Sequence, residues 1–209
     1  MKLFVLGATG PTGLQIVQQA LAKNHLVTAF VRDPARLPIS DANLATVTGA
    51  LPGDARALAD ALPGHDAVIS SLGLHNALKA HHFSENNMRV LVPSMEQKGV
   101  RRLIVVSANG VGDTHRHSPL LPRLMYRLLL ADIFADKKAG EDIVRASRLD
   151  WTFAYPTLLT NGPRTGNYRA GERLELKGMP KISRADVADF VLRQLLEPTF
   201  LGKGAVLSN

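Results

Sequence analysis

The stretch Lys2-Leu-Phe-Val-Leu-Gly7-Ala-Thr-Gly10-Pro-Thr-Gly13 decides the fold, because it joins a short apolar run to a turn with regularly spaced glycines. The apolar residues Leu3–Leu6 are too few for a helix and are typical of a buried parallel strand. A helical pattern of apolar residues begins directly after the last glycine. The stretch therefore predicts a strand, a tight turn and a helix in immediate succession.

This order of elements around the glycines is typical of a turn that binds a nucleotide pyrophosphate. The spacing Gly-x-x-Gly-x-x-Gly differs from the Gly-x-Gly-x-x-Gly of many dinucleotide-binding proteins, but each glycine has the same use. The first permits the tight turn, the second lets backbone amides approach the phosphates, and the third lets the helix pack on the strand. The helix N-terminus adds free amides and a positive dipole end. We therefore expect the cofactor phosphates to contact Gly7, Thr9, Gly10, Pro11, Thr12 and Gly13.

Apolar runs and helical patterns alternate along the rest of the chain. Further strands are expected at 26–31, 44–47, 67–70, 103–106 and 151–154, and helices at 13–23, 54–62, 84–98, 123–146 and 184–196, the last after an N-capping Ser183. This order predicts an α/β fold: a Rossmann-type doubly wound parallel sheet with helices on both faces. We expect a single domain, 1–209, in which the Gly- and Pro-rich residues 156–182 form a small irregular lobe on the substrate side.

Composition argues against several other classes of protein. The chain has no cysteine, so it has no disulfide or thiolate metal site. Its N-terminal apolar run is too short for a signal peptide, and we expect no stretch to span a membrane. The net charge of +7 comes from scattered residues without a nucleic-acid-binding motif, and it suits an anionic cofactor better. The pairs His81-His82 and His115-x-His117 lack carboxylates at ligand spacing, so we expect no metal. We expect a cytoplasmic protein without nucleic-acid or membrane partners.

The order of motifs along nearly the whole chain resembles that of the atypical short-chain dehydrogenase/reductase superfamily. Within it, the resemblance is to the NAD(P)H-binding group that includes biliverdin reductase B, also a flavin reductase. The stretches that carry it are Gly7–Gly13, Val31–Asp33, Ser70–Gly73, Val105–Ser107, Asp136–Glu141, Ala146–Thr152, Asn161–Tyr168 and Ile182–Asp186. The resemblance implies that the further cofactor contacts come from Ala50, Leu51, Leu72, Gly73, Ser107, Ala108, Pro156, Thr157 and Leu158.

The end of the second strand indicates which nicotinamide cofactor is bound. Folds that select NAD place a carboxylate there for the ribose diol, whereas Arg32 would pair with the 2′-phosphate of NADP. Arg36 follows in a short helix that we expect Asp33 to cap, with Pro34 at its first position. NADP(H) is the favoured cofactor. The alternative is that Arg32 is a solvated strand end and Asp33 the diol acceptor.

The usual catalytic residues of short-chain reductases are incomplete in this sequence. Lys137 matches the family lysine, but Ile133 stands where its tyrosine would be, and Ala108 and Leu158 replace the serine and histidine of biliverdin reductase B. The remaining catalytic candidates are Ser107, Lys137 and Tyr155. Tyr155 stands where many relatives have Arg, and a structural role is favoured for it over proton transfer. Acceptors that delocalise charge need no strong enzymic acid.

Two functions follow from the resemblance. The first is an NADPH-dependent oxidoreductase that transfers hydride to a flavin (FMN or FAD), a quinone or a linear tetrapyrrole. The second is a redox sensor, similar to NmrA-like proteins, that binds NADP(H) without turnover. The apolar stretch 120–134 suits a core helix, a lid over a flat substrate or a dimer face, in that order, so the chain is expected to be a monomer or a homodimer.

Overall fold

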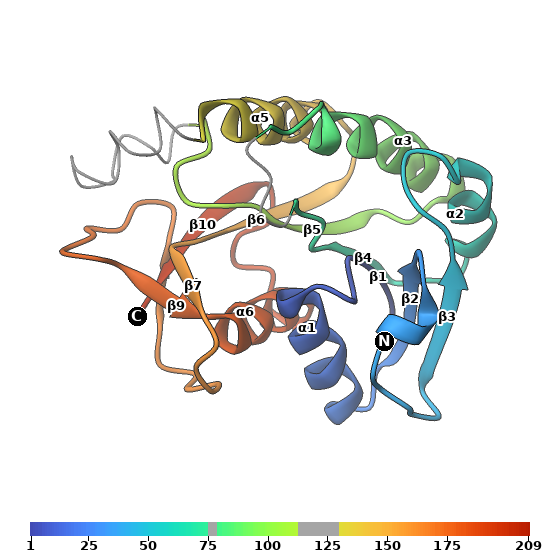
Figure 1. Ribbon diagram of the computed structural model, residues 1–209, viewed down its shortest axis with the longest axis horizontal. Helices are drawn as coiled ribbons and strands as arrows, with labels where there is room; N and C mark the ends of the chain where they lie inside the picture. Colours follow the sequence, from blue (N-terminus) through green and yellow to red (C-terminus); the bar gives the residue numbers. More distant parts are fainter. Residues whose placement is uncertain (75–78, 113–129) are drawn as a thin grey trace.

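A computed structural model describes residues 1–74, 79–112 and 130–209 (Figure 1). The described strands are β1 (Lys2–Leu6), β2 (Leu26–Val31), β3 (Leu44–Thr48), β4 (Ala67–Ser70), β5 (Arg102–Val106), β6 (Asp150–Pro156), β7 (Leu158–Thr160), β8 (Arg169–Gly171), β9 (Lys181–Ser183) and β10 (Lys203–Ser208). The helices are α1 (Pro11–Ala22), α2 (Ala55–Ala61), α3 (Phe83–Lys98), α5 (Ala131–Arg145) and α6 (Arg184–Leu196), with a 3₁₀ turn, η1, at Pro34–Arg36.

The main sheet has eight strands in the order β3-β2-β1-β4-β5-β6-β10-β8. All neighbouring strands are parallel except β10 and β8, which are antiparallel. The strand order reverses between β1 and β4, which is the switch point where such sheets bind ligands at their carboxyl ends. The predicted doubly wound Rossmann-type fold is confirmed.

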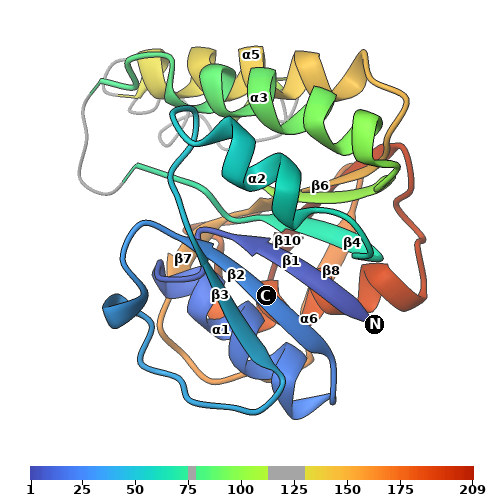
Figure 2. The ribbon, with the colours of Figure 1, turned by 90° about the vertical axis from the view of Figure 1, so that its right-hand side faces the viewer.

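Helices cover both faces of this sheet (Figures 1 and 2). Helices α1 and α6 pack against each other on one face, and α2, α3 and α5 lie on the other. Strand β1 is buried on both faces, which explains why its residues form an unbroken apolar run. Leu3 and Val5 belong to the core beneath α1 and α6, while Phe4 and Leu6 belong to the core beneath the other three helices.

Three differences separate the predicted elements from the observed ones. The 156–182 region is less irregular than expected, because it contains β7, β8 and β9, and β7 pairs with β9 in a second small sheet. Strand β10 was not predicted, although it extends the main sheet beyond β6. The helix expected at 123–146 is described only as α5, over Ala131–Arg145. Residues 123–129 of the expected helix, His115, His117 and most of the 120–134 stretch lie outside the described residues.

The described helices include none that is both long and apolar enough to cross a lipid bilayer.

Candidate functional site

The turn after β1 uses its three glycines in different ways. Gly7 has a φ of +78°, and a Cβ there would lie 2.7 Å from the carbonyl oxygen of Ser71. A Cβ on Gly13 would overlap the carbonyl group of Gly7. A Cβ on Gly10 would meet only the Gly7 oxygen, at 3.3 Å. Gly7 and Gly13 are therefore required by packing, whereas a Cβ on Gly10 would meet a single backbone oxygen, slightly closer than usual, and nothing else within 4 Å.

The N-terminus of α1 is suited to an anion. Gly10 is its N-cap residue and supplies no side-chain hydrogen bond, and Pro11 stands at the start of the helix. The first turn has no acidic residue, so the positive end of the dipole is not neutralised. Thr9 and Thr12, both partly exposed, flank the opening. A glycine at the N-cap and a helix start without a side-chain cap fit a pyrophosphate.

Two exposed arginines lie at the end of β2. Asp33 caps η1, as expected, because its Oδ1 accepts a hydrogen bond from the Ala35 amide at 3.0 Å. Arg32 precedes this cap and Arg36 ends the turn, and both side chains are exposed. One oxygen of the Asp33 carboxylate is thus used by the backbone of η1.

The loop after β3 offers less to a ligand than expected. The Ala50 amide donates to Asp54 Oδ2 at 2.7 Å, so this N–H is already used within the loop. Leu51 packs against the core beneath α2, α3 and α5. Any contact from this loop to an adenine therefore comes from surfaces other than the Ala50 amide.

The loops after β5 and β6 place another set of predicted residues at the same edge of the sheet. Ser107 is buried, and its amide donates to the carbonyl oxygen of Ala154 at 2.8 Å. Ala108 follows it, and Pro156 and Thr157 lie opposite, where the Thr157 hydroxyl donates to the Leu207 carbonyl oxygen at 3.0 Å. Leu158 is 52% exposed at the start of β7.

A small cavity lies below this edge, between the sheet and helices α3 and α5. It has a volume of about 20 Å³, room for about one water molecule. Its lining includes Leu72, Ser107 and Lys137, three residues predicted to form the site, and also Ser70 and Asn87. Among the described residues, Ser70 Oγ and the Asn87 amide atoms Oδ1 and Nδ2 have no hydrogen-bond partner. Burial lowers the pKa of the Lys137 ammonium, while the carboxylates of Glu141 and Asp136 oppose this shift.

Glu141, on α5, joins two of the catalytic candidates. Its Oε1 accepts a hydrogen bond from the Ser107 hydroxyl at 2.6 Å, and its Oε2 accepts one from the Tyr155 hydroxyl at 2.6 Å. Arg145 donates to Oε2 at 3.2 Å and to the Tyr155 oxygen at 2.7 Å. We call these four side chains, Ser107, Glu141, Arg145 and Tyr155, the Glu141 cluster.

Tyr155 is held inside this cluster rather than at the sheet edge. It is buried, and burial together with the neighbouring Glu141 carboxylate raises the pKa of its phenol well above the usual range. A phenol with a raised pKa is a weak proton donor at neutral pH. Sequence reasoning named Glu141 only as part of a motif and did not use Arg145. Glu141 and Arg145 are four residues apart on a predicted helix, and this spacing is the sequence signal for their ion pair.

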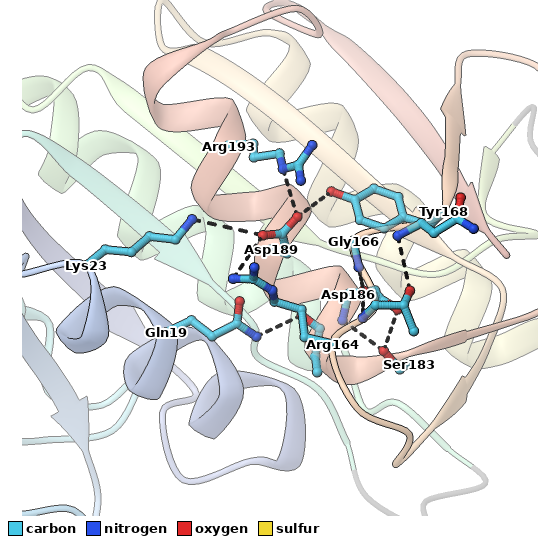
Figure 3. Close-up of polar contacts among 12 residues, drawn as sticks. Gln19, Lys23, Arg164, Gly166, Tyr168, Ser183, Asp186, Asp189 and Arg193 are labelled. Carbon is cyan, nitrogen blue, oxygen red and sulfur yellow. Dashed lines mark hydrogen bonds and ion pairs between the residues drawn. The ribbon is translucent and has the colours of Figure 1, made fainter.

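The segment 164–168 is anchored to α6 by two buried carboxylates (Figure 3). Asp186 Oδ1 accepts hydrogen bonds from the amides of Thr165 and Gly166, both at 2.8 Å. Ser183 caps α6 as predicted, since its hydroxyl oxygen accepts a bond from the Asp186 amide at 2.9 Å. The second carboxylate, Asp189, contacts Arg193, Tyr168, Arg164 and, from α1, Lys23. These bonds fix this segment to the α1 and α6 layer.

No three potential metal-binding side chains gather anywhere in the described ranges. His82, one of the histidines considered for a metal, contacts Glu85 through Nδ1 at 2.9 Å and faces solvent.

A family model of NAD(P)H-binding proteins matches residues 7–198 of the chain. The chain belongs to this NAD(P)H-binding family. An uncharacterized chloroplastic protein of Arabidopsis thaliana, At2g34460, is 30% identical to this NAD(P)H-binding protein over 207 residues, which cover 94% of this chain and 72% of the plant protein.

Solved structures confirm the fold of this NAD(P)H-binding protein. A short-chain dehydrogenase/reductase from Veillonella parvula, in complex with NADP, has a TM-score of 0.85 and 20% identity, with 100% of this chain and 94% of that chain covered. ChuY, an anaerobilin reductase from Escherichia coli O157:H7, has a TM-score of 0.79 and 22% identity, with 99% and 96% covered. At these identities the likeness shows the Rossmann-type fold alone.

Proposed function

We propose that the protein is an NADPH-dependent reductase that transfers hydride to a flavin, a quinone or a linear tetrapyrrole. The observation that carries the proposal is the glycine turn at the start of α1, which has no side-chain cap, with Arg32 and Arg36 exposed after the next strand. Together they provide separate positive sites for a pyrophosphate and a 2′-phosphate. The chain's membership of an NAD(P)H-binding family supports the nicotinamide cofactor.

Each part of the proposed site has a distinct task. The turn at Gly7–Gly13 would hold the pyrophosphate, Arg32 and Arg36 the 2′-phosphate, and the loops after β4, β5 and β6 the nicotinamide half. When bound, the reduced nicotinamide supplies a hydride. Ser107 and Lys137 would orient the nicotinamide half, while the buried core behind β5 excludes water.

The surface beside Leu158 favours an apolar acceptor. Leu158 is 52% exposed and Met179 is 79% exposed, and the Leu158 amide bonds to the carbonyl oxygen of Pro180, next to Met179. Exposed apolar groups at the substrate side suit a flat conjugated molecule. The structural likeness to ChuY, an anaerobilin reductase, supports a tetrapyrrole as one member of this class.

Oxidation of NADPH, followed at saturating cofactor with FMN, FAD, quinones and biliverdin as acceptors, tests this proposal. We expect turnover with at least one of these acceptors and slower turnover with NADH. Tight binding of NADPH without turnover of any acceptor would contradict the reductase.

The position of Tyr155 makes a second prediction for the reductase. Its hydroxyl is bound to Glu141 and Arg145, so Tyr155→Phe is expected to lower turnover by less than about tenfold, whereas loss of a true general acid typically costs about 10²–10⁴-fold. A fall of about a hundredfold in steady-state turnover would make Tyr155 the proton donor.

A sensor that binds NADP(H) without turnover is the second candidate. It is favoured by Ile133 at the position of the family tyrosine and by the raised pKa of buried Tyr155, which together leave no phenol suited to donate a proton among the described residues near Ser107. The acceptor panel separates the two functions.

A further inference from the structure

The direction of the hydrogen bond between Ser107 and Glu141 limits what Ser107 can do. A carboxylate only accepts hydrogen bonds, so in the 2.6 Å contact Ser107 is the donor. Its single hydroxyl proton is used there, and only oxygen lone pairs remain for another partner. Ser107 in this state binds a hydrogen-bond donor and does not protonate a substrate.

The rest of the Glu141 cluster keeps the carboxylate in this orientation. Tyr155 and Arg145 both bind Oε2, which leaves Oε1 facing Ser107. The Arg145 guanidinium is itself held over two aromatic rings, 4.8 Å from the ring centre of Phe153 and 5.2 Å from that of Trp151. Glu141 is 4% exposed, so its carboxylate is shielded from bulk solvent.

We propose that Glu141 is a positioning residue that fixes Ser107 as the hydrogen-bond acceptor for the carboxamide N–H of the nicotinamide. This inference rests on the proposed function, which places the nicotinamide half of the cofactor at the carboxyl ends of β4, β5 and β6. In the nicotinamide half of the cofactor, the carboxamide NH₂ is the amide group that donates hydrogen bonds. Adenosine 2′,5′-bisphosphate, which carries the 2′-phosphate but no nicotinamide, lacks this donor.

The variant Glu141→Gln reverses the hydrogen bond with almost no change of shape. Tyr155 and Arg145 both donate, so they retain the amide oxygen of the new side chain and direct its NH₂ group toward Ser107. Ser107 then accepts a hydrogen bond from this NH₂ group, and its own proton turns toward the site, where it opposes the carboxamide donor. We expect the Kd of NADPH to rise about five- to tenfold, and that of adenosine 2′,5′-bisphosphate to change less than about twofold.

Two further variants make the test specific. Asp142→Asn makes the same change from carboxylate to amide at an exposed position of the same helix that is paired with Lys138, so it is expected to leave both dissociation constants within about twofold of the unmutated protein. Ser107→Ala is expected to weaken NADPH as Glu141→Gln does, and the two changes combined are expected to cost no more than either alone. Binding is measured by calorimetry, with thermal denaturation of each variant alongside. If Glu141→Gln does not fold, the selective loss in Ser107→Ala decides the question.

The possible outcomes separate the two levels of the proposal. An unmutated protein that binds neither NADPH nor the bisphosphate would end the proposed function itself. If the unmutated protein binds NADPH and the bisphosphate, three results would overturn the role of Glu141 and leave the proposed function standing. In these, Glu141→Gln weakens both ligands equally, weakens neither, or adds to the effect of Ser107→Ala on NADPH binding.

Discussion

Gly10 and Gly13 lie three residues apart, yet a side chain is expected to disturb mainly cofactor binding at Gly10 and mainly folding at Gly13. Gly10→Val places a side chain in the space proposed for the pyrophosphate, so it should abolish binding of NADPH and NADH. Its Cβ meets only the Gly7 oxygen, at 3.3 Å, so the melting temperature should fall far less than in Gly13→Val. Gly13→Val drives its Cβ into the Gly7 carbonyl and should destabilise the fold by about 1–3 kcal/mol. Calorimetry and thermal denaturation of the pair check both results. Unchanged NADPH affinity in a folded Gly10→Val variant would show that the site is elsewhere.

Arg32 is expected to decide between the two nicotinamide cofactors. Arg32→Ala should weaken NADPH about ten- to a hundredfold, because a charge-assisted bond to a phosphate contributes about 1.5–3 kcal/mol, and should leave NADH almost unchanged. The dissociation constants of both cofactors are measured for the variant and the unmutated protein. Equal constants in the unmutated protein would rule out the arginine site.

Among the elements, helix α3 depends on a cap that comes from another helix. His82 precedes α3 with a φ of +56° and offers it no side-chain hydrogen bond. Instead Asp136, on α5, accepts bonds from the amides of Ser84 at 2.8 Å and Glu85 at 3.1 Å. Asp136→Ala should lower the free energy of unfolding in urea by about 1–2 kcal/mol. Asp142→Ala, which removes an exposed partner of Lys138 on the same helix, should change it by less than about 0.5 kcal/mol. Equal effects of the two variants would show that the cap contributes nothing.

The difference between local and distant signals explains which elements could be predicted. The glycine turn and the caps at Asp33 and Ser183 involve residues close in sequence, and the structure has them as expected. The cap on α3 and the bond from Ser107 to Glu141 join residues far apart in the chain, so no local pattern revealed them. Strand β10 was missed because its short apolar run becomes a strand only by pairing with β6 and β8.

For the whole molecule, Asp186 links the stability of the fold to pH. Burial alone would raise the pKa of this carboxyl, but hydrogen bonds from Gly166, Ser183 and Thr165 outweigh it and hold the pKa below its usual value of about 3.8. The stabilisation is therefore complete above that value and is lost as pH falls through the lower, folded-state pKa. We expect Asp186→Asn to be less stable than the unmutated protein in urea at about pH 7 and pH 5, with a smaller gap at about pH 3. The exposed Asp60→Asn should show no such trend. A gap that does not vary with pH would contradict the assignment.

The place of β10 in the sheet has a consequence for how the protein is made. During synthesis β6 emerges long before β10, and until then one edge of β6 has no neighbour. A bare parallel edge is a template for pairing with another chain, and pairing between strands distant in sequence is slow. During this period the unpaired edge of β6 in a nascent chain can pair with a strand of a second nascent copy. Crowded polysomes and rapid dilution from denaturant are the conditions under which this protein will aggregate first.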